Sequence, residues 1–366
     1  MRSIARLNTR PFAPLGSSSR LRPRASQAAH SQPPPRPPIG RPGPSSQHGS
    51  RQGFGTCTQR RASNMADARA WGAWQIQPSK FTQLVVDSMK KLYPEELADR
   101  SWDNVGLLVG NAQTRKKAAK VMVTNDLTYQ VAIDAIEQDV SVIVSYHPFI
   151  FSGLKSITNR DPQQATLLRL AQADIAVYCP HTAVDAGPRG LNTWLADIIA
   201  GQHASSRSVA IPCATAPESH APAGYGALGR FDDDVAVPLP EILKRLAVGL
   251  GGLQYVMVAS PVGADVATTT VRSFGVCAGS GYDVLKGADV ELLVTGETSH
   301  HSALRVIQQG RTLVQVFHSN SERAYLNLVL RPRLEEQLRA EAPAAEVVLS
   351  VYDRDPFRIV DVRELA

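Results

Sequence analysis

The chain has 366 residues, of which 43% are hydrophobic and 20% are charged, a composition typical of a soluble globular protein long enough for two domains. No apolar run reaches the ~18–20 residues that a membrane-spanning helix requires. The net charge of +6 is unevenly distributed, because residues 1–66 contain eleven Arg and no Asp, Glu or Lys. The other 28 basic residues face 33 acidic ones, so the body of the chain has no basic excess that would favour nucleic-acid binding.

Residues 1–75 are rich in Pro, Ser, Gly and Arg, and such a segment cannot bury enough apolar surface to fold. We therefore expect a disordered basic tail. Its first residues are also Arg-rich, Ser-rich and free of acid, which is the composition of a mitochondrial transit peptide. A plain basic tail and a true start at Met65 are equally open alternatives. The expected location is cytoplasmic or mitochondrial, with the nucleus as a further option.

The four cysteines are Cys57, Cys179, Cys213 and Cys277. They form no CxxC pair, and their spacing resembles neither a disulfide framework nor a zinc ribbon. Cys179 and Cys277 follow apolar runs that predict strands, so we interpret them as reduced thiols of the core. This fits an intracellular protein.

The first half of the folded chain, residues 76–201, alternates predicted helices and strands. A helix follows the N-cap Ser79, and a polar turn at Ser101–Val105 leads into a strand. A strand–helix–strand unit spans about residues 119–147. Asp161-Pro162 opens another helix with a capping residue and a proline at its first position, and a strand at 175–178 leads to His181.

Residues 202–225 are rich in Ser, Ala, Pro and Gly, and they predict a linker loop between the halves. The second half, residues 226–366, predicts a helix at 240–250, strands near 254–259 and 270–276, a unit at 292–318, a charged helix at 321–341 and a strand near 346–351. Alternating strands and helices predict α/β layers.

The two strand–helix–strand units share a spacing. Asp126 precedes His147 by 21 residues and Glu297 precedes His318 by 21, and the units align at an offset of 171. This predicts an internal duplication, although chance similarity between two ordinary units is the alternative. Each His would lie at the carboxyl end of a strand, where open α/β sheets place ligands. The predicted architecture is an internally duplicated α/β fold with a metal site between the halves.

Imidazoles and carboxylates cluster at the predicted strand ends, and together they suit Zn, Mn or Fe. The candidate ligands are His147, Asp185, His318 and Glu322, a set that leaves room for water as a catalytic site requires. Each residue also has a structural interpretation. Asp126 would cap a helix at 127–138, Glu297 would cap one at 299–309, and His181 would be a hydrogen-bonded core residue or an outer partner of the ligands.

Five motifs carry a resemblance to a known family: Ser101-Trp-Asp-Asn-Val-Gly-Leu-Leu108, Ser145-Tyr-His-Pro148, Pro180-His-Thr-Ala-Val-Asp185 with Gly190-Leu-Asn192, Thr295-Gly-Glu-Thr-Ser-His-His301 and His318-Ser-Asn-Ser-Glu-Arg323. In this order, over about residues 79–360, the chain resembles the NIF-three-like family. These are the Ngg-interacting-factor homologues, also called GTP cyclohydrolase I type 2 homologues. The chain is most similar to the short eukaryotic branch.

The resemblance implies a duplicated α/β fold, a ring-shaped homo-hexamer and two divalent ions held by His147, Asp185, His318 and Glu322. Many members have two adjacent histidines where this chain has Tyr146-His147, so one metal position lacks a ligand here. The resemblance also suggests a metal-dependent hydrolase that acts on a small molecule, with a GTP cyclohydrolase-like ring opening as the reaction. Glu297 or His181 would then be the general base. The alternative is a non-catalytic regulatory or scaffold protein that interacts with transcriptional machinery and holds a structural metal.

Overall fold

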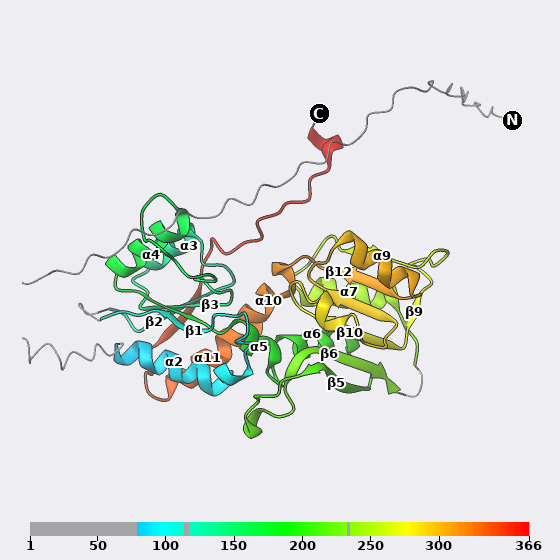
Figure 1. Ribbon diagram of the computed structural model, residues 1–366, viewed down its shortest axis with the longest axis horizontal. Helices are drawn as coiled ribbons and strands as arrows, with labels where there is room; N and C mark the ends of the chain where they lie inside the picture. Colours follow the sequence, from blue (N-terminus) through cyan, green and yellow to red (C-terminus); the bar gives the residue numbers. More distant parts are fainter. Residues whose placement is uncertain (1–78, 113–116, 233–234, 366) are drawn as a thin grey trace, which may run out of the picture. The chain divides into compact units, whose positions relative to one another are not determined.

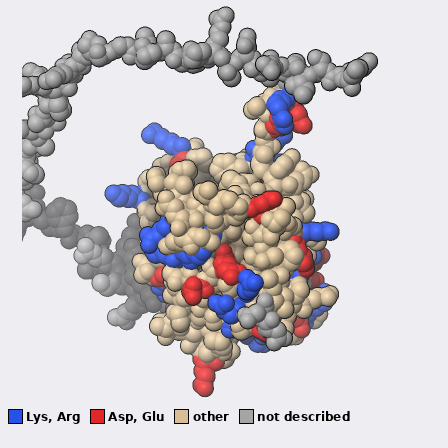
Figure 2. Space-filling model, turned by 90° about the vertical axis from the view of Figure 1, so that its right-hand side faces the viewer, with Lys and Arg blue, Asp and Glu red and all other residues tan. Residues whose placement is uncertain are grey.

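The computed structural model describes residues 79–112, 117–232 and 235–365. The tail at 1–75 and the interpretations made of it lie outside the described residues. Among the helices that are described, none is long and apolar enough to cross a membrane. Basic and acidic side chains are interspersed on the face drawn in Figure 2.

The first sheet has five strands in the order β1-β4-β3-β2-β13. They are β1 (Gly106–Val109), β2 (Lys120–Thr124), β3 (Val142–Ser145), β4 (Ala176–Cys179) and β13 (Glu346–Leu349). β13, β2, β3 and β4 run parallel, and β1 is antiparallel to β4. The sequence predicted the last strand, but not that it would return to pair with β2.

Helices cover both faces of this sheet (Figure 1). On one face lie α3 (Tyr129–Glu137) and α4 (Pro162–Gln172), and on the other α2 (Lys80–Leu92) and α11 (Arg331–Arg339). The alternation of β2 explains why both faces are apolar: Val121 and Val123 pack in one core cluster, whereas Met122 packs in another. The N-cap Ser79 and the N-cap Asp161, which is followed by Pro162, are confirmed.

The second sheet has six strands in the order β5-β6-β10-β11-β12-β8. They are β5 (Ser205–Pro212), β6 (Gly224–Phe231), β8 (Met257–Ala259), β10 (Ser273–Cys277), β11 (Leu292–Thr295) and β12 (Thr312–Gln315). The central strands β10, β11 and β12 are parallel. The helices α6 (Leu191–Ala200), α7 (Leu239–Gly249), α8 (Tyr282–Leu285) and α9 (His300–Gln308) contribute to the clusters that pack on it.

The short elements are α5 (His181–Ala186), α10 (Arg323–Tyr325), a π-helical turn at Leu326–Leu330, and a two-stranded sheet of β7 (Val237–Pro238) and β9 (Thr270–Val271). Short 3₁₀ turns lie at Glu95–Leu97, Glu218–His220, Ser319–Ser321 and Val362–Leu365. The turn at Ser319–Ser321 connects β12 to α10 and so places the residues on either side of it.

The prediction of a loop over residues 202–225 is wrong for Ser205–Pro212, which forms β5 and pairs antiparallel with β6. β5 is an edge strand with most of its side chains exposed or half-buried. A strand that buries little carries polar residues and lacks the apolar run by which strands are recognised. Because β13 lies in the first sheet, a division of the chain into halves must also return Glu346–Leu349 to the first one.

The two predicted strand–helix–strand units are present as β2-α3-β3 and β11-α9-β12, each with parallel strands. The predicted capping roles of Asp126 and Glu297 are wrong. Thr128 caps α3 by accepting from Val131 N, and Ser299 caps α9 by accepting from Ser302 N. The hydroxyl side chains satisfy the helix starts, which leaves both carboxylates for other partners.

Candidate metal centre

His147 and His318 meet at the carboxyl ends of β3 and β12. Their Nε2 atoms are 3.4 Å apart, although the residues are 171 positions apart in the chain. Their ring centroids are 5.3 Å apart. Each follows a buried parallel strand and comes from a different sheet. The expectation that folding brings these two imidazoles together is therefore met by the geometry.

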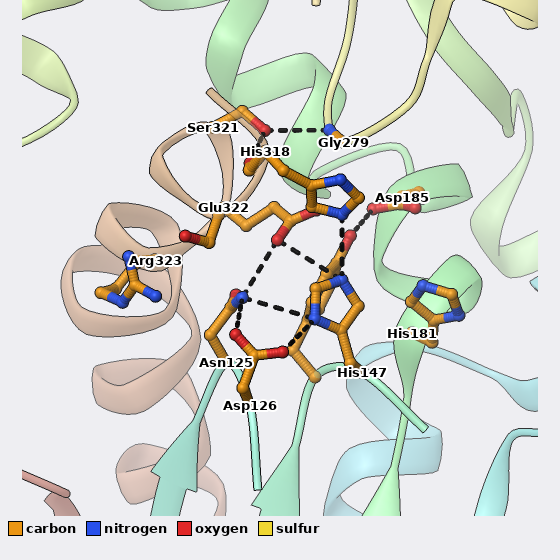
Figure 3. A network of polar contacts seen from close by, with 12 residues as sticks. Asn125, Asp126, His147, His181, Asp185, Gly279, His318, Ser321, Glu322 and Arg323 are labelled. Atoms are coloured by element: carbon orange, nitrogen blue, oxygen red, sulfur yellow. Dashed lines mark hydrogen bonds and ion pairs between the residues drawn. The ribbon is translucent and has the colours of Figure 1, made fainter. Parts of the chain in front are cut away.

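Glu322 completes a three-residue group (Figure 3). The 3₁₀ turn after His318 directs its carboxylate back to the imidazoles, so that Oε1 lies 3.3 Å from His318 Nε2 and Oε2 lies 3.5 Å from His147 Nε2. One ligand atom from each residue lies within 4.8 Å of the others, and this group can hold a metal ion. Glu322 is only 2% exposed.

Carboxylates hold the outer nitrogen of both imidazoles. His147 Nδ1 lies 2.9 Å from Asp126 Oδ1, and His318 Nδ1 lies 2.9 Å from Glu297 Oε1. A carboxylate on Nδ1 keeps a proton there and directs Nε2 towards the centre, an arrangement common among metal-binding histidines. Asp126 and Glu297 therefore orient the two imidazoles.

Asn125 connects the site and was missed by the sequence analysis. Its Nδ2 donates to Glu322 Oε2 at 3.1 Å and to Asp126 Oδ2 at 3.1 Å. Its backbone N–H donates to Asp353 Oδ2 at 2.9 Å. Asn125 is fully buried directly after β2. Its position next to an apolar strand was the only sequence signal that pointed to it.

The ionisable groups stabilise each other in their charged forms. Burial alone would raise the pKa of Glu322, but hydrogen bonds with His147 and His318 outweigh it and bring that pKa to about 2. Burial lowers the pKa of His147, but its bonds to Asp126 and Glu322 raise it to about 10. Hydrogen bonding to Glu322 raises the pKa of His318 to about 9. The centre thus holds a buried anion between two strongly basic imidazoles.

These residues fit a divalent cation. Two imidazole Nε2 atoms and a buried carboxylate are borderline nitrogen and oxygen donors, which suit Zn, Mn or Fe. Asn125 Oδ1 is buried and has no hydrogen-bond partner among the described residues. The centre therefore contains an unsatisfied oxygen acceptor, which a cation would satisfy. The ligands would be His147, His318 and Glu322.

Asp185, the fourth predicted ligand, lies in the same cavity but outside this group. Its Oδ1 accepts a hydrogen bond of 2.6 Å from the Tyr146 hydroxyl. Burial raises the pKa of Asp185 to about 6, against the lowering effect of His181. The Tyr146 hydroxyl thus hydrogen-bonds to the carboxylate oxygen that the resemblance led us to expect as a metal ligand.

His181 lines the same cavity, and a buried carboxylate orients it. His181 Nδ1 lies 2.7 Å from Asp103 Oδ1, and Thr182 donates to Asp103 through both its backbone N–H and its hydroxyl. The His181 and His147 ring centroids are 5.4 Å apart. Asp103 was quoted only as part of a motif, because its pairing with a residue 78 positions away leaves no local pattern.

The centre therefore defines an α/β protein with a candidate divalent-metal site where strands of two sheets end. Residues 82–356 match the family model Duf34/NIF3 (NGG1p interacting factor 3), and the chain belongs to this family.

Two yeast relatives and two solved structures illustrate the similarity. "Protein NIF3 homolog" of Schizosaccharomyces pombe is 42% identical over 74% of this chain and 94% of its own length. "NGG1-interacting factor 3" of Saccharomyces cerevisiae is 37% identical over 75% of this chain and 96% of its own length. A Bacillus cereus protein related to NIF3 is 18% identical, with a TM-score of 0.59, and the match covers 75% of this chain and 98% of that protein. Reduced HcgD from Methanocaldococcus jannaschii is 19% identical, with a TM-score of 0.58, and the match covers 74% of this chain and 97% of that protein. The two structures establish likeness of fold.

Proposed function

We propose that this chain is a metal-dependent hydrolase acting on a small molecule. The observation that carries the proposal is the convergence of His147, His318 and Glu322 in a cavity of about 580 Å³ that also contains the Asp103-oriented His181. A purely structural metal is usually enclosed by its ligands, whereas this group opens into a cavity of small-molecule size.

A divalent ion bound by the three ligands would polarise the substrate and make water more acidic. His181 is our general base, because the Asp103 carboxylate fixes its Nδ1, so that Nε2 is the atom that takes the proton. Glu297 is already bonded to His318 Nδ1, so we assign it an orienting role. In hydrolysis, the water oxygen bonds to the attacked carbon, His181 accepts the water proton, and the leaving nitrogen takes that proton as its bond to carbon breaks.

We propose one ion per chain, held by the group of three, in place of the two ions that the resemblance implies. Asp185 is the ligand that remains for a second ion, and Tyr146 hydrogen-bonds to it. Metal analysis of the full chain tests this. One equivalent of Zn, Mn or Fe is expected in the wild type, and two equivalents would contradict the proposal.

The activity test uses the metal-loaded full chain with GTP and other nucleotides, whose ring opening is the reaction that the family label suggests. His318→Ala should abolish turnover together with metal binding, and Asp185→Ala should reduce turnover. His301→Ala, an exposed neighbour on α9, is the matched control. Activity that survives in both His318→Ala and Asp185→Ala would end the hydrolase proposal.

The alternative is a regulatory or scaffold protein with a structural metal. The printed name of the Saccharomyces cerevisiae relative describes an interacting factor. In this chain the C-terminal segment exposes large apolar side chains, with Phe357 78%, Val362 76% and Leu365 71% exposed. A metal-bound protein that turns over none of a broad panel of substrates would favour this alternative.

We further propose that the two strand–helix–strand units arose by duplication, that residues 76–201 and 226–366 correspond to the two halves with β13 returning to the first, and that the chain forms a homo-hexamer in the cytoplasm or mitochondria. Light scattering on the full chain tests the hexamer, and imaging of the tagged full chain tests the compartment.

A further inference from the structure

Large apolar side chains lie open to solvent within the cavity of the candidate metal centre. Trp102 is 51% exposed and Phe151 is 54% exposed, and both line the cavity together with Ile211 of β5, which is 45% exposed. Apolar side chains of this size are usually covered by neighbours in a folded protein. Exposed in a cavity, they are typical of a surface that a ligand covers.

Contacts with its neighbours fix Trp102 in place. Its Nε1 donates to Asp99 Oδ2 at 3.0 Å, and its ring meets His181 edge-on, with centroids 5.8 Å apart and planes at 89°. Phe151 lies beside it at a centroid distance of 6.2 Å. Rings held before a ligand arrives lose little freedom on binding, which favours a flat, stacking partner.

The charged side chains of the cavity argue against recognition of a phosphate chain. Among the described residues that line it, none is Lys or Arg, and three are acidic: Asp99, Asp185 and Glu322. Proteins that recognise phosphate groups do so with basic side chains or clustered backbone N–H groups. The cavity walls therefore offer a polyphosphate chain repulsion from carboxylates and neither Lys nor Arg, and the imidazoles of His147 and His318 are already paired with carboxylates.

We propose that the aromatic wall formed by Trp102 and Phe151 binds the planar heteroaromatic ring of an uncharged compound, and that the protein recognises this ring and not a phosphate chain. The wall places the ring beside His181, the general base of the proposed function. The substrate class rests on that proposed function, whereas ring binding itself does not.

Calorimetric titration of the zinc-loaded full chain tests the proposal with guanosine, GTP and ribose 5-phosphate as probes. Guanosine should bind, GTP should bind no more tightly than guanosine, and ribose 5-phosphate should show no binding. GTP binding more than about tenfold tighter than guanosine would mean that phosphate is recognised, and the proposal would be wrong.

Variants locate the binding surface. Trp102→Ala and Phe151→Ala should each weaken guanosine binding at least about tenfold, the scale of lost ring stacking, while Trp102→Phe should stay within about threefold of wild type. Phe357→Ala removes an exposed ring outside the cavity and should change nothing. All four should keep the wild-type zinc content. Unchanged guanosine affinity in Trp102→Ala and Phe151→Ala would overturn the proposal.

The two proposals fail separately. Guanosine binding that depends on Trp102 without any turnover would refute the hydrolase and leave the ring site in place. Turnover that depends on His318 but not on Trp102 or Phe151 would refute the ring site and leave the hydrolase in place.

Discussion

The units β2-α3-β3 and β11-α9-β12 use the same local design for their histidines. Thr128 and Ser299 cap the two helices, and these capping residues are 171 positions apart. Each unit then places a histidine whose Nδ1 is 2.9 Å from a carboxylate oxygen. The two regions therefore share the helix cap and the carboxylate that holds the histidine.

The units differ in what surrounds the histidines. At the offset of 171, Asn125 of the first unit corresponds to Gly296, which has no side chain, and Phe151 corresponds to Glu322. Only the second unit supplies a buried carboxylate to the metal group, while the first supplies an amide and an exposed ring. A common scaffold thus sets two imidazoles in place, and the unequal positions determine where charge and apolar surface lie.

The largest effect should come from the position where the units differ most, Glu322. Glu322→Gln removes the only carboxylate of the metal group, so zinc affinity should fall by more than about 100-fold, beyond the range typical of outer partners. Calorimetry and metal analysis measure this. Glu364→Gln on the exposed C-terminal turn is the control. Wild-type zinc affinity in Glu322→Gln would show that the three residues are not the metal site.

The shared carboxylates come next. Asp126→Asn and Glu297→Gln should each weaken zinc binding by about 10–100-fold, because the imidazoles lose the partner that orients them. The loss should be greater for Asp126, whose side chain is 39% exposed against 51% for Glu297. Competition with a chelator ranks the two variants. Equal affinity to the wild type in both would mean that these contacts do not orient the ligands.

Asn125 has no counterpart in the second unit, and its loss should destabilise the metal-free protein. Asn125→Ala removes one hydrogen-bond donor from the buried Glu322 and one from Asp126, which costs about 1–3 kcal/mol. Urea denaturation measures the free energy of unfolding. Asn327→Ala, an exposed residue of the π-helical turn, should stay within about 0.5 kcal/mol of wild type. A similar small change for Asn125→Ala would refute its connecting role.

A further effect is a pH dependence of zinc binding that is common to both histidines. Their pKa values, raised to about 10 and about 9, mean that protons occupy the imidazoles of the metal-free chain at pH 7. Zinc binding to both Nε2 atoms must displace one proton from each imidazole, so affinity should rise by up to about 100-fold per pH unit between pH 6 and 8 and fall as pH decreases. Titrations in buffers of different ionisation enthalpy count the protons. Zinc affinity that is independent of pH would contradict this assignment.

Local sequence patterns predicted the parts of the site that short segments form. Apolar runs located β3 and β12, and the polar residues after each run located His147 and His318. The same approach failed for β5, whose exposed edge position leaves no apolar run, and for the helix starts, where Thr128 and Ser299 took the role expected of Asp126 and Glu297.

The sequence by itself determined the α/β alternation, the two equally spaced units and the chemical types of the ligands, because helix periodicity, strand runs and caps depend on residues close together in the chain. Only the tertiary structure decided that His147 and His318 lie 3.4 Å apart, that Asp103 orients His181, that Tyr146 engages Asp185 and that β13 joins the first sheet. These contacts join segments separated by tens to hundreds of residues. They depend on how the sheets and helices pack, which no local pattern records.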